Sequence, residues 1–440
     1  MHITSRVRRY AALTATLTLA IQFFTACSST PSTSSTTDNS PINITFMTTA
    51  DDVGTAGATA LAEAFMKENS NIRVTITTHP TGSDGDNLVK TKLATGDMDD
   101  VFLYNSGALL AALNPTQNLV DLSDQAWFAQ TTDDFKLTVE GKYGAPITTT
   151  QAGGILYNKK VYARLGLTIP TTWQQFMDNS AVIQQAGIAA VIQTYGADAT
   201  FSSQLWVLAD FANVLAQDPQ WATQFTANNR SFATDPALAG FTHLEQAAKA
   251  GYFNQDFASA TLDDGVKLLA TGQGAHYPML TGLLPTIVQN YPDDIDDIGY
   301  FATPADAASH TQATIWEPNA LYIPKTTTGE KLDAAKKLIA FIDSPAGCAI
   351  QNQVYTPSGP YAISSCTLPT TVAPALTDLQ AYVDKGEAAP ALEFLSPVKG
   401  PNLEKILIEE GTGQTTALQA AANYDQDVKT QAQQLNLPGW

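Results

Sequence analysis

The chain has 440 residues, of which 44% are hydrophobic and 15% are charged, and its formal net charge is −19. This length favours two lobes or one large interrupted fold over a single ordinary core, and the hydrophobic content excludes a disordered chain. The strong negative charge argues against binding to nucleic acid or to an anionic membrane surface, and is typical of a solvated acidic exterior.

The first 27 residues have the pattern of a bacterial export signal. Three arginines precede an apolar stretch at residues 11–24, which is too short to cross a membrane comfortably. The stretch ends in Phe-Thr-Ala-Cys, and small residues before a cysteine resemble a lipobox. We therefore expect cleavage of residues 1–26 and lipidation of Cys27, which would anchor the protein at the cell surface, on the outer face of the bacterial cytoplasmic membrane. An ordinary cleaved signal with an incidental cysteine is the alternative.

A tether and then a folded region follow this signal. Residues 27–41 are mostly Ser, Thr, Pro and Asn, which cannot form a core, so we expect a flexible tether. Beyond it, apolar residues alternate as in β-strands or recur at helical spacing. We expect in turn a strand at 42–46, a polar loop at 48–55, a helix around 61–68, a strand at 72–76, a helix at 87–94 and a strand at 101–104. This order predicts right-handed crossovers and a doubly wound lobe.

The segment at residues 142–173, KYGAPITTTQAGGILYNKKVYARLGLTIPTTW, predicts a crossover between two lobes. It contains strand patterns at 143–147 and 153–157, separated by polar, β-branched and glycine-flanked residues. Such a connection lets the backbone bend and still present side chains. A helix is expected at 158–165, because Gly166 can take the left-handed position that ends a helix.

The rest of the chain is mostly helical. Thr172 and Gln175 have the spacing of a capping box at the start of the next helix. Gly411–Thr416 lacks the lysine of a phosphate-binding loop and is expected to be a turn between two helices. We also expect helices from 173 to about 251, a strand at 321–323, a helix around 335–342 ended by a proline, and helical structure over 404–436.

The 142–173 segment resembles the signature YGxP…LxYNKxxFxxxGLxxPxTW of the family 1 extracellular solute-binding proteins, the maltose-binding-protein-like lipoproteins of ATP-driven importers. FMKENSNIRV and GDMDDVFLYNSGALLAAL, nearer the start, resemble the opening elements of that family. The resemblance covers nearly all of residues 42–436. It implies an α/β fold of the two-lobed, periplasmic-binding-protein type II kind. In this fold each lobe is a sheet flanked by helices, and crossing segments form a hinge.

The resemblance also implies how the chain is divided between the lobes. We expect an N-terminal lobe of residues 42–150 and 314–360 and a C-terminal lobe of residues 151–313 and 361–440. The expected crossings lie near 148–150, 314–318 and 357–361.

Two cysteines lie beyond the signal. An exported protein folds where disulfides persist, so we expect Cys348 and Cys366 to be joined. Two free thiols fit the spacing as well.

No catalytic constellation is evident in the sequence. The four histidines beyond the signal are scattered, none has the spacing of a zinc site, and no Gly-x-Ser-x-Gly motif is present. The chain is therefore predicted to be no enzyme and to need no cofactor or metal. Two carboxylates distant in sequence can still meet in a cleft, as in a glycoside hydrolase.

The residue types favour a neutral ligand. Phosphates and carboxylates are usually held by arginine, and only Arg73, Arg164 and Arg230 follow the signal. A polyhydroxy ligand needs aromatic faces and planar amides or carboxylates, which an α/β lobe presents in loops after strands. The candidates of these types are Asp51, Asp52, Asn105, Gln151, Trp206, Tyr277, Trp316, Glu317, Asn319 and Tyr361.

For each aromatic candidate the alternative is ordinary core packing. Trp206 and Tyr277 are included because the resemblance implies ligand contacts in their segments. Trp173 follows the capping threonine and is expected to be structural.

Together these features predict a monomeric, lipid-anchored protein that captures a neutral carbohydrate, an oligosaccharide, by hinge closure and delivers it to the membrane permease of an ABC importer. One alternative keeps the fold but binds a polyamine or other cation through Asp51, Asp52 and Glu317. A secreted glycoside hydrolase and an adhesive lipoprotein without a small ligand are alternatives of other classes.

Overall fold

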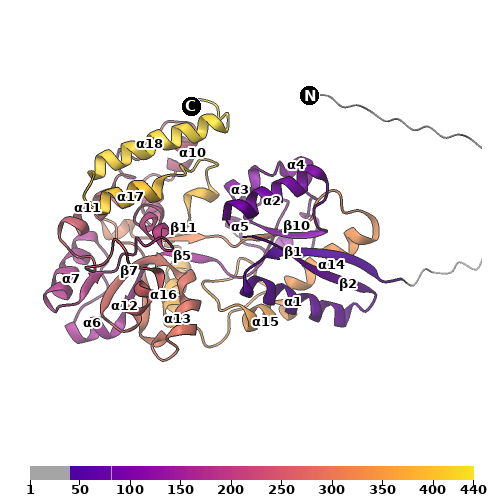
Figure 1. The fold of residues 1–440 in the computed structure, drawn as a ribbon, viewed down its shortest axis with the longest axis horizontal. Coiled ribbons are helices and arrows are strands. Elements are labelled where there is room, and N and C mark those ends of the chain that lie inside the picture. Colours follow the sequence, from indigo (N-terminus) through magenta and orange to yellow (C-terminus); the bar gives the residue numbers. More distant parts are fainter. Residues whose placement is uncertain (1–39, 81) are drawn as a thin grey trace, which may run out of the picture. The chain divides into compact units, whose positions relative to one another are not determined.

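A computed structural model describes residues 40–80 and 82–440, and the predictions for the export signal, Cys27 and most of the tether lie outside this part. Residues 41–440 form one compact unit (Figure 1). Among the described residues, no helix combines the length and the apolar character that crossing a membrane requires.

The first sheet has five strands in the order β2-β1-β3-β10-β4. β1 runs parallel to β2 and β3, and β10 is antiparallel to both β3 and β4. The doubly wound lobe predicted from the β-α-β-α-β order is confirmed. The strands are β1 (Ile42–Thr49), β2 (Ile72–His79), β3 (Val101–Tyr104), β4 (Ala145–Pro146) and β10 (Ala320–Tyr322).

Seven α-helices accompany this sheet in the described residues. They are α1 (Asp52–Glu68), α2 (Gly82–Thr95), α3 (Ala108–Ala111), α4 (Pro115–Asn118), α5 (Asp133–Thr138), α14 (Gly329–Ile342) and α15 (Pro345–Val354). The polar loop predicted at 48–55 is wrong, because α1 already begins at Asp52. Asp51 caps that helix, since its side chain accepts a hydrogen bond from the Gly54 amide at 2.7 Å.

The second sheet has the order β11-β9-β5-β7-β6, with β8 also paired to β5. Its central strand, β5, is antiparallel to β7, β8 and β9. The strands are β5 (Gln151–Asn158), β6 (Ala189–Val191), β7 (Gly274–Leu280), β8 (Ile298–Phe301), β9 (Ala313–Trp316) and β11 (Ala388–Pro390). β6 was missed in a region expected to be helical, because three residues are too few to establish an alternating pattern.

The helices of this second part carry most of the C-terminal sequence. They are α6 (Lys159–Leu165), α7 (Trp173–Gln185), α8 (Leu205–Leu208), α9 (Phe211–Gln217), α10 (Trp221–Thr226), α11 (Ala239–Lys249), α12 (Leu262–Ala270), α13 (Leu284–Asn290), α16 (Pro374–Lys385), α17 (Leu403–Gly411) and α18 (Ala417–Gln434). Gly411–Thr416 joins α17 to α18, as predicted. Gly166 ends α6 with φ of 66°, also as predicted. The predicted α/β architecture of two sheets flanked by helices is confirmed (Figure 1).

The chain passes between the two sheets three times. It leaves the first sheet at Pro146 and enters the second at Gln151. The return lies between Trp316 and Ala320, so the start predicted at 314 is too early, because β9 pairs with β5 in the second sheet. The third crossing, predicted at 357–361, is also placed too early. Residues 362, 363 and 366 still pack in the core of the first sheet, and only from 372 does the chain join the second.

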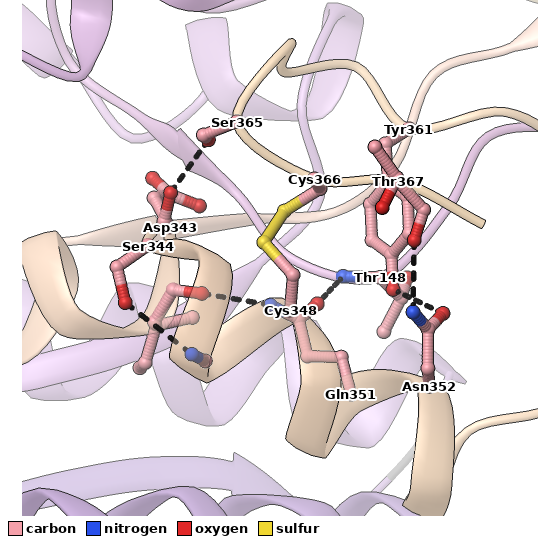
Figure 2. Close-up of a disulfide and its surroundings, with 12 residues drawn as sticks. Thr148, Asp343, Ser344, Cys348, Gln351, Asn352, Tyr361, Ser365, Cys366 and Thr367 are labelled. Carbon is pink, nitrogen blue, oxygen red and sulfur yellow. Dashed lines mark hydrogen bonds between the residues drawn. A yellow bond between two sulfur atoms is a disulfide. The ribbon is translucent and has the colours of Figure 1, made fainter. Parts of the chain in front are cut away.

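The predicted disulfide between Cys348 and Cys366 is present, with the two Cα atoms 5.3 Å apart. Figure 2 shows that it lies beside the first crossing. Gln351, one turn after Cys348 on α15, accepts a hydrogen bond from the Thr148 amide at 2.8 Å. The bridge therefore fixes the loop after α15 against the helix that holds this crossing.

Replacing both cysteines with alanine is expected to lower the free energy of unfolding by about 3 kcal/mol, since the bridge closes a loop of 18 residues in the unfolded chain. Denaturant unfolding of the variant and the wild type measures the difference. A reducing agent should destabilise the wild type to the same level and leave the double variant unchanged. Equal stability of both oxidised proteins would contradict the prediction.

Candidate functional site

A cavity of about 480 Å³ is lined by the crossing segments and by residues that belong to each of the two sheets and their helices. Its volume is in the range of small-ligand sites. On the side of the first sheet, its walls come from α2, the loop after β3 and α3. The other walls come from the first and second crossings, the end of β7, the segment after β11 and the end of α18. The lining residues are Lys90, Asn105, Ser106, Ala108, Leu109, Ala112, Gln151, Leu280, Trp316, Glu317, Asn319, Glu393, Phe394, Pro397, Lys399, Gln431 and Leu435.

Gln151 and Trp316 are directly opposite each other in the antiparallel pairing of β5 and β9. Two glycines make room for them. A Cβ atom on Gly153 would lie 2.5 Å from the Trp316 ring, and one on Gly282 would lie 2.1 Å from the Gln151 side-chain oxygen. The local sequence thus leaves the ring on the strand surface, with its indole only partly buried.

The loop after β3 is fixed to the second crossing. The buried Ser106 hydroxyl donates a hydrogen bond to the Pro318 carbonyl at 3.0 Å. The Tyr322 hydroxyl donates to the Asn105 carbonyl, also at 3.0 Å. These two bonds fix the backbone around Asn105 and around the exposed Asn319, and both side chains line the cavity.

Glu317 lies between these anchors and is partly buried. Among the described residues, no hydrogen-bond partner is present for its buried Oε2 atom. Desolvation, together with the nearby negative charge of Asp134 on α5, raises the pKa of Glu317 to about 8.

Segment 391–399 contributes to the cavity wall through Glu393, Phe394, Pro397 and Lys399, and sequence reasoning missed it. The Ala391 amide donates to the Ile315 carbonyl at 2.8 Å, and Lys399 pairs with Glu393 at 2.8 Å. Phe394 packs against Gly107, in the loop that follows β3 of the first sheet. A Cβ atom on Gly107, where φ is +68°, would lie 2.7 Å from the Phe394 ring. The segment follows strand β11, whose three residues are too few to show a strand pattern in the sequence.

Two leucines add apolar surface to the same cavity. Leu109 on α3 is 39% exposed, and Leu435 at the end of α18 is 43% exposed. The spacing of apolar residues in the sequence does not distinguish these two leucines from other leucines on the surface.

The charged residues lining the cavity give it no surplus of negative charge, because the raised pKa of Glu317 favours its neutral form. Lys90 and Lys399 face the same space as Glu317 and Glu393. Such a lining suits a neutral ligand with hydroxyl groups better than a polyamine, because a cation would find no surplus of negative charge.

Five of the ten predicted ligand residues line the cavity: Asn105, Gln151, Trp316, Glu317 and Asn319. Asp51 instead caps α1, and Asp52 is the first residue of that helix. Tyr361 donates a hydrogen bond to Asn352 beside the disulfide (Figure 2).

Two predicted aromatic residues are in the core. Trp206 is 2% exposed and its indole N–H donates to Gln193, while Tyr277 is fully buried and bonded to Thr194. Core packing, the alternative considered for both rings, describes these positions. Trp173 is also buried, as expected, and stacks on His243.

No group of three or more His, Cys, Asp or Glu side chains in the described part of the chain is arranged to hold a metal ion.

A family model described as "Bacterial extracellular solute-binding protein" matches residues 51–347. The melibiose/raffinose/stachyose-binding protein MelE of Bacillus subtilis is 25% identical over 292 residues, which cover 65% of this chain and 66% of MelE. The multiple sugar-binding protein of Streptococcus mutans is 25% identical over 247 residues, covering 54% of this chain and 57% of that protein. The matches thus span less than two thirds of these relatives.

A crystal structure of the binding protein MsmE of Bacillus subtilis, in an open conformation, superposes with a TM-score of 0.74 at 21% identity. The superposition covers 91% of this chain and all of that chain. At this identity the likeness establishes the fold and nothing about the ligand.

Proposed function

The chain belongs to the bacterial extracellular solute-binding proteins, and from this membership we propose that it captures a neutral carbohydrate, an oligosaccharide, in the cavity lined by Trp316 and segment 391–399. The family comprises binding proteins, so the chain is not an enzyme. The observation that carries the proposal is a partly exposed tryptophan that lines one cavity together with several amide side chains, in a lining without surplus negative charge.

Each part of this lining suits a sugar. The Trp316 ring offers an apolar face for C–H groups, as Phe394 does in the same cavity. Asn105, Gln151 and Asn319 offer planar amides that donate to and accept from hydroxyl groups. Both relatives named above carry sugar-binding names, which supports the same ligand class here.

The proposed mechanism is hinge closure about the crossings. Ligand contacts from residues before and after the crossings would favour a closed state, and this difference in affinity would shift the population toward it. We propose that the closed protein, monomeric and lipid-anchored through Cys27 at the cell surface, docks on an ABC permease. A polyamine ligand is the less favoured alternative, because Asp51 is engaged in capping a helix.

Calorimetric titration with raffinose, followed by analysis of the recovered sugar, tests this function. Saturable binding with intact sugar is the expected result. Recovery of hydrolysed sugar would instead identify a glycoside hydrolase that uses carboxylates such as Glu317 and Glu393. Binding of spermidine that weakens with salt, with no binding of neutral sugars, would favour the polyamine alternative.

A further inference from the structure

Glu317 is a carboxyl group held in an unusual position. It lies in the second crossing, between Trp316, whose ring lines the cavity, and Pro318, whose carbonyl is bound by Ser106. Its backbone is thus fixed, and the side chain contributes to the cavity wall. Its Oε2 atom is buried, and no residue in the described part of the chain satisfies it.

The charges that face Glu317 do not stabilise an ionised carboxylate. Asp134 on α5 is the neighbouring charge that acts on it, and it is negative. In the same cavity, Lys399 is engaged with Glu393, and Lys90 on α2 makes no ion pair with Glu317 in the described residues. A desolvated carboxylate without a cation, close to a second carboxylate, is costly, so the neutral acid is the favoured form.

We infer that Glu317 holds the ligand as a neutral carboxylic acid, donating its O–H to an acceptor oxygen of the sugar, so that ligand is released when this carboxyl group ionises. The inference rests on the proposed carbohydrate function. It adds a hydrogen-bond donor, the Glu317 O–H, for which the ligand must supply an acceptor oxygen. A neutral carboxyl group donates and accepts, as a sugar hydroxyl does, whereas a carboxylate only accepts. Ring and glycosidic oxygens of a sugar can accept but not donate, so they fit the neutral acid alone.

The direction of the pH dependence follows from the raised pKa, which is about 8 in the free protein. Below this value the binding-competent acid predominates, and the affinity is constant. Above it the competent fraction falls tenfold per pH unit, and the apparent affinity is expected to fall about tenfold per pH unit with it.

Titration of the full mature protein with raffinose between about pH 6 and about pH 10 tests the inference. The wild type is expected to lose affinity above about pH 8 and to take up close to one proton on binding at about pH 9, measured in buffers of different ionisation enthalpy. Glu317→Gln is expected to bind with a pH-independent affinity, because the amide donates and accepts without titrating. Asp134→Asn removes the neighbouring charge outside the cavity, and should move the loss of affinity to lower pH.

Two results would overturn the inference while leaving the carbohydrate function intact: a wild-type affinity that does not change with pH, or one that rises above about pH 8. A pH dependence that persists in Glu317→Gln would assign the titration to another group and overturn it as well. If neither protein bound raffinose or any other neutral mono- or oligosaccharide at any pH, the carbohydrate proposal would be overturned, and this inference with it.

Discussion

Replacing Glu410 with glutamine is expected to raise the free energy of unfolding at neutral pH, and the gain should grow as the pH rises. Glu410 is 1% exposed at the end of α17. Neither of its carboxyl oxygens has a hydrogen-bond partner among the described residues. Burial raises the pKa of Glu410 to about 9, and the charge of Glu245 on α11 acts in the same direction.

The sign follows from proton linkage. In the unfolded chain Glu410 ionises near its ordinary pKa of about 4.3, whereas in the folded protein it keeps its proton up to about pH 9. The folded state therefore binds the extra proton between these values, and the stability of the wild type falls as the pH rises through this window. Each pH unit costs up to about 1.4 kcal/mol, so even part of the effect amounts to several kcal/mol. Glutamine has no proton to lose and removes the dependence.

Denaturant unfolding at a series of pH values measures this difference. Glu409→Gln is the matched control, because that neighbouring side chain is 37% exposed and pairs with Lys405 on the helix surface. The control should change stability by less than about 0.5 kcal/mol at every pH. If Glu410→Gln and the wild type showed parallel stability curves from acid to alkaline pH, the buried neutral carboxyl group would be disproved.

Replacing Trp316 with alanine is expected to weaken sugar binding about fivefold to a hundredfold. Stacking on an aromatic ring is worth about 1–3 kcal/mol where bases have been measured, and each 1.4 kcal/mol is a factor of ten. The ring lies on Gly153 of β5 and lines the cavity, so its loss removes the apolar face and leaves the amide side chains in place. Calorimetric titration of both proteins with the same sugar measures the change.

Two further variants separate binding from packing. Trp316→Phe keeps an aromatic face and should recover much of the affinity. Trp206→Phe alters a tryptophan that is 2% exposed in the core, and should lower stability without changing affinity below the melting range. A Trp316→Ala protein with wild-type affinity and reduced stability would make Trp316 a packing residue and move the site elsewhere.

The local elements of the fold were largely readable from the sequence. Strand alternation and helix caps are determined by neighbouring residues, so Thr172 was identified as a cap, and its side chain does accept from the Gln175 amide. The Gln175 side chain completes the box one residue earlier than expected, at the Thr171 amide, at 2.8 Å. The same reasoning could have identified Asp51 as a helix cap, since aspartate before a helix is a capping signal.

The rest depends on contacts between distant segments. Trp206 and Trp316 look alike in the sequence, and only the tertiary fold buries the first against Gln193 and leaves the second on the cavity wall. Phe394 contacts Gly107, and no local pattern relates two residues so far apart. The third crossing was misplaced because the disulfide retains the residues around Cys366 in the first core.

Thermal unfolding against a panel of neutral mono- and oligosaccharides, polyamines and anions tests the central claim most directly, because a ligand that binds only the folded state raises the midpoint with its concentration. We predict a shift with one class of neutral sugar, and none with polyamines or anions. A midpoint that moves with a polyamine or an anion and with no neutral sugar would contradict the claim.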